Sequence, residues 1–100
     1  MYQINYIFLK IKQFKGGSTV SETKSFQEKC RRLGAKIKYY RTIGGMNQTV
    51  LANKLGISYQ YLSRIECGKQ SPSFPLLVAL AEELHVDMAE LVSERDSRRF

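Results

Sequence analysis

The chain has 100 residues, with 16 lysines and arginines against nine aspartates and glutamates, and a formal net charge of +7. This length allows one domain and excludes a chain of several domains. Two cysteines are too few for a disulfide framework and lack metal-site spacing, so we expect reduced thiols in a cytoplasmic protein with no metal and no cofactor. The longest uncharged apolar run near the N-terminus is too short to cross a bilayer, so we expect no membrane partner.

The positive charge is concentrated in the first 70 residues. They hold thirteen basic and three acidic residues, whereas residues 71–100 hold three basic and six acidic ones. A basic front and an acidic back suit a protein that meets a polyanion with one side. We favour this interpretation over the simpler one, in which the charges only keep a small domain soluble.

An N-terminal extension, residues 1–25, is expected to combine an amphipathic segment with a flexible polar connector from residue 16 onward. The first 15 residues fit a helix or an alternating strand almost equally well. As a basic amphipathic helix the segment can lie on a membrane or on a partner helix. We favour packing on its own domain or across a dimer. Its helically spaced apolar residues are Ile4, Ile7, Phe8, Ile11 and Phe14.

A different origin for this extension is a translated leader. Lys15-Gly16-Gly17 can be encoded AAA-GGA-GG, a ribosome-binding sequence, and Val20 follows at the usual distance as a GUG start. On this hypothesis residues 1–19 do not belong to the native protein. The intact mass of the protein from its own host tests it, because a species that retains Met1 contradicts it.

A first domain helix is predicted within residues 26–42, a strongly basic stretch. Gly34 is expected to weaken a long helix at its centre, so that the compact domain begins near Leu33. A turn over residues 43–46 ends this helix at two glycines and places Met46 against the core. The apolar face of the helix consists of Leu33, Ile37 and Tyr40.

The central stretch, residues 48–67, has the pattern of two short helices joined by a tight turn. Ala52 lets the second helix cross closely, and Gly56 suits a left-handed backbone between them. Asn47 and Ser58 are the expected N-caps. In this geometry the second helix can enter a DNA major groove. The apolar positions fall at steps typical of helices: Leu51, Leu55, Ile57, Leu62 and Ile65.

Two more helices are expected after a loop that begins at Gly68. Ser73 caps the fourth helix, and Pro75 is tolerated in its first turn. Asp87 and Glu90 have the spacing of a capping box, which predicts a fifth short helix through Leu91 and then a frayed tail, residues 93–100. The buried stripe of the fourth helix consists of Leu77, Leu80, Ala81 and Leu84.

These five helices, closed by the sequence IECGKQSPSFPLLVALAEELHVDMAEL, resemble the lambda-repressor and Cro type of helix-turn-helix proteins, the Xre family. The resemblance covers roughly Leu33 to Val92. It implies an all-α, five-helix DNA-binding domain, which we place at residues 26–92. The spacing from Gln48 to Gly56, the Glu-x-Gly-Lys motif at residues 66–69 and the following proline carry it.

The resemblance also implies which side chains meet DNA. Gln48 begins the second helix, where an amide and free N–H groups meet a phosphate. In the third helix, Gln60 can bond an adenine and Arg64 a guanine, whereas the tyrosines suit a thymine methyl or a phosphate. Lys69 is placed for the DNA backbone. The expected DNA-binding set is Gln48, Ser58, Tyr59, Gln60, Tyr61, Ser63, Arg64 and Lys69.

Two further positions match a scaffold pair of the family. The resemblance implies a partly buried ion pair between Arg41 and Glu66, which we interpret as structural. The sequence departs from the family at Val50, where an acidic residue is more usual, and at Tyr59, which is bulkier than the common residue. Val50 is expected to expose an apolar contact surface, and Tyr59 prevents copying a base preference from relatives.

The leading functional interpretation is a sequence-specific transcriptional regulator, a repressor that binds a palindromic site in double-stranded DNA as a homodimer. A phage, mobile-element or antitoxin protein fits it. The alternative is a module that binds a partner protein. An enzyme is the weakest option, because His85 is the one histidine and no nucleophile, base or metal cluster accompanies it. A helix-end role is expected for His85.

Overall fold

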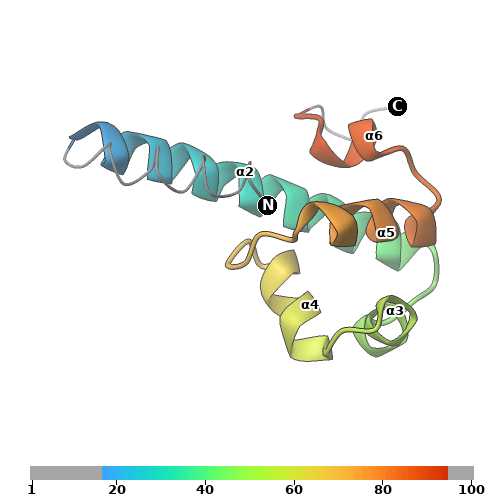
Figure 1. Ribbon diagram of the computed structural model, residues 1–100. Coiled ribbons are helices and arrows are strands. Elements are labelled where there is room, and N and C mark those ends of the chain that lie inside the picture. Colours follow the sequence, from blue (N-terminus) through green and yellow to red (C-terminus); the bar gives the residue numbers. More distant parts are fainter. Residues whose placement is uncertain (1–16, 95–100) are drawn as a thin grey trace.

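The fold is a bundle of helices arranged around one long helix, as a computed structural model that describes residues 17–94 shows (Figure 1). All regular elements in this range are helices, which confirms the predicted all-helical class. The amphipathic segment, most of the leader proposed for residues 1–19 and most of the tail lie outside the described residues. The elements are α2 (Gly17–Ile43), α3 (Gln48–Leu55), α4 (Tyr59–Glu66), α5 (Phe74–Leu84) and α6 (Met88–Val92).

The length of α2 differs from the sequence prediction. The helix spans 27 residues from Gly17, so the flexible connector expected up to residue 25 was wrong for all but its first residue. The serines and threonines of this stretch are only moderately poor helix formers, and it contains no proline. Extending a helix that is already held by packing needs no new nucleation, so α2 continues outward past the other helices.

Gly34 does not break α2, contrary to the expected weak point, because the glycine serves a packing role. A Cβ atom on Gly34 would lie 2.3 Å from the carbonyl oxygen of Ile65 and 2.6 Å from that of Glu66. The last turn of α4 therefore rests directly on the backbone of α2. The cost of a glycine within a helix is offset by this close approach. The compact domain begins at least as early as Cys30, which is also buried.

The helix ends follow the predicted capping residues. Asn47 Oδ1 accepts the N–H of Val50 at 2.8 Å, and Ser58 Oγ accepts the N–H of Tyr61 at 3.1 Å. Ser73 caps α5 in the same way. Gly56 ends α3 with φ 72°, the left-handed backbone expected for the turn between α3 and α4. These caps set the direction of α4 relative to α3.

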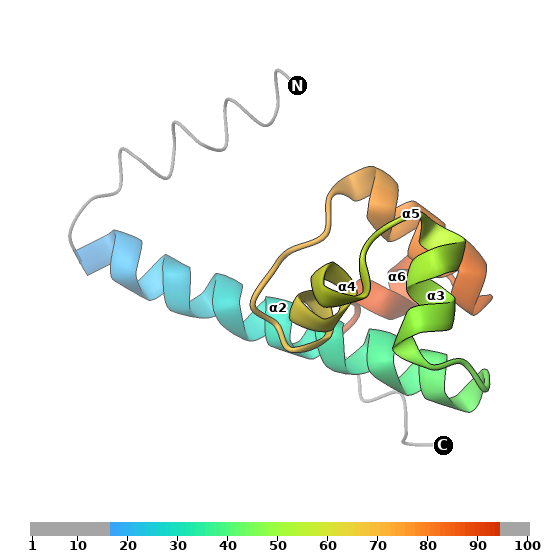
Figure 2. The same cartoon turned by 90° about the horizontal axis from the view of Figure 1, so that it is seen from below.

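The core lies where α3, α4, α5 and α6 meet the C-terminal half of α2. Figures 1 and 2 show these four short helices gathered along that half, while the other half of α2 extends past them. The predicted apolar stripes are confirmed, and Met46 packs against them. The buried core residues are Ile37, Leu51, Ala52, Leu62, Ile65, Leu80, Ala81, Leu84 and Leu91.

The end of α5 and the start of α6 are held in different ways. His85 adopts a left-handed conformation (φ 59°) and its N–H bonds the last carbonyls of α5, which confirms its helix-end role. The predicted capping box of α6 was wrong, since Asp87 makes no side-chain cap bond. Glu90 instead reaches α2, where its carboxylate accepts the hydroxyl of Tyr40 at 2.9 Å and contacts Lys36 Nζ at 3.4 Å.

Over residues 17–94, no helix combines the length and the apolar character needed to pass through a bilayer.

The close approach at Gly34 gives a prediction on stability. Gly34→Ala adds a Cβ that meets backbone atoms of α4, so the free energy of unfolding should fall by about 1–3 kcal/mol. Urea denaturation followed by circular dichroism measures this. Gly44→Ala is the matched control, because its Cβ would meet nothing closer than 3.2 Å. Equal stability of both variants would contradict the proposed packing role.

Candidate DNA-binding face

The outward side of α4 is set by the residues that the helix buries. Leu62, Ile65 and Glu66 face the core. The other positions of α4 lie on the remaining sides of the helix and are exposed to different degrees. Ser58, Tyr59, Gln60 and Arg64 are exposed, and Ser63 is half-buried. We call Tyr59, Gln60, Ser63 and Arg64 the reading face.

Tyr59 is the largest apolar group on this face, with 49% of its surface exposed. Its ring makes no part of the core cluster. A half-exposed aromatic ring at the first position of α4 is available to a ligand that enters from the N-terminal end of the helix. Tyr59, which is bulkier than the residue common at this position in the family, therefore lies on the surface.

The side chain of Tyr61 lies partly inside the domain. Its ring is half-buried and packs against the core. The guanidinium of Arg64 lies over this ring, 5.9 Å from its centroid, at the distance of a cation–π contact. Tyr61 is therefore positioned to support Arg64 from behind, and the spacing of the two residues on one helix was the signal for it.

A buried ion pair joins α2 to the last turn of α4, as predicted. Arg41 Nε donates to Glu66 Oε2 at 2.7 Å, and Arg41 Nη2 donates to Glu66 Oε1 at 3.0 Å. Arg41 Nη1 also donates to the carbonyl oxygen of Met46 at 2.8 Å. Two parallel bonds match the planar guanidinium to the carboxylate, and the third fixes the turn before α3.

Gln48 belongs to the same group of contacts, which the sequence did not reveal. Its amide Nε2 donates to Glu66 Oε1 at 2.9 Å. One N–H and the carbonyl oxygen of this amide are left for other partners. We call Arg41, Gln48 and Glu66 the anchor network. Through it, Gln48 at the N-terminus of α3 is tied to the C-terminal end of α4.

Lys69 lies on the loop just after α4 and is exposed. Its backbone N–H donates to the carbonyl oxygen of Arg64 at 2.9 Å, so the loop stays attached to the helix end. Gly68 before it has φ 78°, and a Cβ there would lie 2.6 Å from the Cα of Arg31. The loop therefore presses against α2, a contact that the sequence did not predict.

The side chains exposed on α4 and its loop suit hydrogen bonding to a ligand. Both cysteines are free thiols. Within residues 17–94, no three histidine, cysteine or acidic side chains lie close enough to hold a metal ion. The exposed groups of α4 and its loop are amides, hydroxyls and cations, which can bond to base edges and phosphates.

Comparison with known proteins identifies the fold. A helix-turn-helix family model matches residues 37–91, more than half of the chain. The chain belongs to the helix-turn-helix family. The matched region contains α3 and α4, which confirms the resemblance to lambda-repressor-type proteins.

Several relatives share this region. An uncharacterized HTH-type transcriptional regulator, MJ0272 of Methanocaldococcus jannaschii, is 38% identical over 61 residues, 61% of this chain and 92% of the relative. SinR of Bacillus licheniformis, also an HTH-type transcriptional regulator, is 35% identical over 69 residues, 68% of this chain and 62% of SinR. The ImmF control region 10 kDa protein of Bacillus phage phi105 is 40% identical over 58 residues, 58% of this chain and 64% of that protein.

A solved structure has a similar arrangement of helices. The restriction-modification controller protein C.AhdI from Aeromonas hydrophila matches with a TM-score of 0.59 and 27% identity, over 62% of this chain and 94% of that one. In helix-turn-helix terms, α3 is the supporting helix and α4 the recognition helix. The reading face thus lies on the element that this family of folds presents to DNA.

The anchor network gives a prediction on stability. Glu66→Ala removes the carboxylate and leaves the buried guanidinium of Arg41 without its partner, so the free energy of unfolding should fall by about 3 kcal/mol or more. Thermal and urea denaturation measure the loss.

A double variant separates loss of the pair from loss of packing. Replacing both Arg41 and Glu66 by leucine removes both charges, so it should cost less than Glu66→Ala alone. If the double variant is instead the less stable of the two, an unpaired Arg41 is not the cause of the destabilisation.

Proposed function

We propose that this helix-turn-helix transcriptional regulator acts as a repressor that binds a palindromic operator as a homodimer. One observation carries the proposal. Beside the exposed reading face of α4, the side-chain amide of Gln48 donates to the carboxylate of Glu66. At the last turn of α4, the backbone N–H of Lys69 donates to the carbonyl oxygen of Arg64. Two groups suited to phosphates thus lie beside a surface suited to bases.

Each member of the predicted DNA-binding set has a role in this proposal. Gln60 and Arg64 read base edges in the major groove, each worth about 1–3 kcal/mol of discrimination. Tyr59 contacts a thymine methyl or a phosphate. Gln48, Ser58, Ser63 and Lys69 bond to the backbone or to nearby base edges. Tyr61, half-buried behind Arg64, supports that arginine and touches DNA only with its hydroxyl.

A dimer follows from the small number of base contacts. One α4 presents few side chains to the groove, so useful specificity requires two half-sites about 34–36 Å apart, one turn of DNA. The resemblance to lambda-repressor and Cro type proteins favours repression, and several relatives are named as regulators or control proteins. They include a protein of a phage control region and a restriction-modification controller. The cytoplasmic location expected from the sequence suits such a protein.

An alternative is a module that binds a partner protein through its exposed apolar side chains. Val50 is 41% exposed and Ile43 63% exposed, near the start of α3. Salt separates the two functions. DNA binding should weaken steeply with salt, with a slope near −0.9 per phosphate contacted, whereas a largely apolar protein contact should not. The charge of the surface around α4 favours DNA.

Selection of bound sites from random duplexes tests the proposed function. Substituting alanine for Gln60 or Arg64 should change which bases are chosen at one position of each half-site, because each side chain reads its own base. Lys69→Ala should keep the selected sequence and weaken all sites about equally. Selected sites that do not change with Gln60 or Arg64 would contradict base reading by α4.

A further inference from the structure

The part of α2 that precedes the family match carries basic residues on two sides. Arg31 and Arg32 are neighbours in sequence, about 100° apart around the helix. Arg32 lines a hollow between α2 and α6, whereas Arg31 lines a cleft between α2 and the loop after α4. The two arginines therefore face different surroundings.

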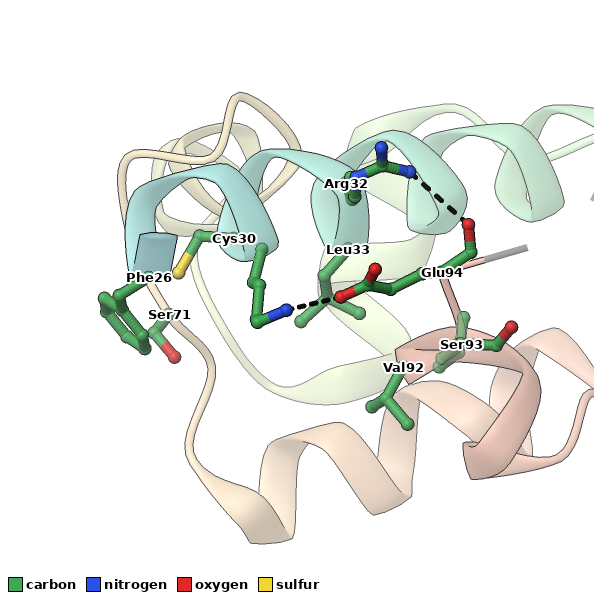
Figure 3. A pocket seen from close by; sticks show the side chains of 10 residues that line it. Phe26, Cys30, Arg32, Leu33, Ser71, Val92, Ser93 and Glu94 are labelled. Carbon is green, nitrogen blue, oxygen red and sulfur yellow. Dashed lines mark hydrogen bonds and ion pairs between the residues drawn. The ribbon is translucent and has the colours of Figure 1, made fainter. Parts of the chain in front are cut away.

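On the α6 side, the basic groups are paired with an acidic residue of another element. Lys29 forms an ion pair with the carboxylate of Glu94, and Arg32 donates to the backbone oxygen of the same residue (Figure 3). Arg32 Nε also lies 3.6 Å from the carboxylate of Glu28. The hydrogen bond from Lys29 lowers the pKa of the Glu94 carboxyl below its ordinary value. On this side of α2, the cations Lys29 and Arg32 thus lie beside an acidic residue that follows α6.

On the loop side, the basic groups border the proposed phosphate contact. The cleft has a volume of about 540 Å³ and is lined by Gln27 and Arg31 from α2 and by Lys69 and Gln70 from the loop. Because Gly68 packs against the backbone of Arg31, this arginine and Lys69 line the same cleft. Figures 1 and 2 show the segment after α4 lying beside α2.

Three exposed side chains continue this surface away from the loop. Lys24, Gln27 and Arg31 follow one another at steps of three and four, so they share one side of α2. Lys24 lies about 10 Å from Arg31 along the helix axis. We call these three residues the α2 stripe. The residues are a cation, an amide and a cation, all of which bond to phosphate oxygens.

Arg31 is paired only with a neighbour on its own helix surface among the contacts described. It donates to both carboxylate oxygens of Glu28, with Nε 3.2 Å from Oε1, and its side chain is 64% exposed. The hydrogen bond from Arg31 lowers the pKa of Glu28. Exposed pairs of this kind contribute little to stability, so a phosphate can compete for the guanidinium.

We propose that the α2 stripe binds the DNA backbone next to the phosphate contacted by Lys69, and so extends the interface beyond the helix-turn-helix unit. The proposal rests on the proposed function. The contact is independent of sequence, because only phosphates are bonded. It adds affinity and salt dependence to a protein whose base preference is set by α4.

The test compares Arg31→Gln with Arg32→Gln in the full chain. Both variants lose one positive charge, from adjacent positions of one helix. Fluorescence anisotropy with a selected operator duplex and a scrambled duplex is measured over a series of KCl concentrations. Arg31→Gln should lower the salt slope by about 0.9 on both duplexes, which corresponds to about eightfold weaker binding at 0.1 M salt. Arg32→Gln should leave the slope near that of the unmodified protein.

Controls separate this contact from other causes. Lys69→Ala should also lose about 0.9 in slope, and circular dichroism should show unchanged helix content in all variants. An unchanged slope for Arg31→Gln overturns the α2 contact while the proposed function stands. Equal losses for both arginine variants also overturn it, since net charge alone then explains the effect. If the unmodified chain does not bind DNA, the proposed function fails and this contact fails with it.

Discussion

The arrangement of the candidate DNA-binding face depends on one buried carboxylate. Glu66 lies at the last turn of α4 and is 7% exposed. It receives two bonds from Arg41 on α2 and one from Gln48 on α3. Removing a charge from water is costly unless it is fully bonded, so the three partners must keep this geometry together. The relative placement of α2, α3 and α4 is thereby fixed at one point.

The backbone packing around this carboxylate has its own requirement. Gly34 and Gly68 bring the end of α4 and the following loop against α2, with no space for a Cβ at either position. The close approach of α2 and α4 shortens the distance that the Arg41 side chain must span to reach Glu66. The ion pair in turn holds the two helices at that distance. The same approach places the loop with Lys69 beside Arg31. Packing within the scaffold therefore also determines which cations lie together on its surface.

Local interactions were the part of the structure that the sequence predicted well. Asn47, Ser58 and Ser73 cap helices because each bonds an N–H three residues ahead, and Gly56 turns the chain with its own backbone. The Arg41–Glu66 pair was predicted through the family resemblance. Three other interactions between distant segments were not predicted: the contact at Gly34, the bond from Gln48 to Glu66, and the bond of Glu90 to Tyr40 of α2 in place of a cap bond in α6. No pattern along the chain encodes such distances.

The length of α2 depends both on local helix propensity and on contacts between distant segments. Propensity alone favoured a break near Gly34, yet that glycine is where another helix rests, so the helix is continuous. A continuous α2 carries Lys24 and Arg31 outward on a rigid element instead of a flexible chain. Rigid placement lowers the entropy lost when side chains bind a phosphate. Glu94 meanwhile bonds to Lys29 and Arg32 on another side of α2. On α2, Arg31 thus lies beside the loop that follows α4, the helix that carries the candidate DNA-binding residues.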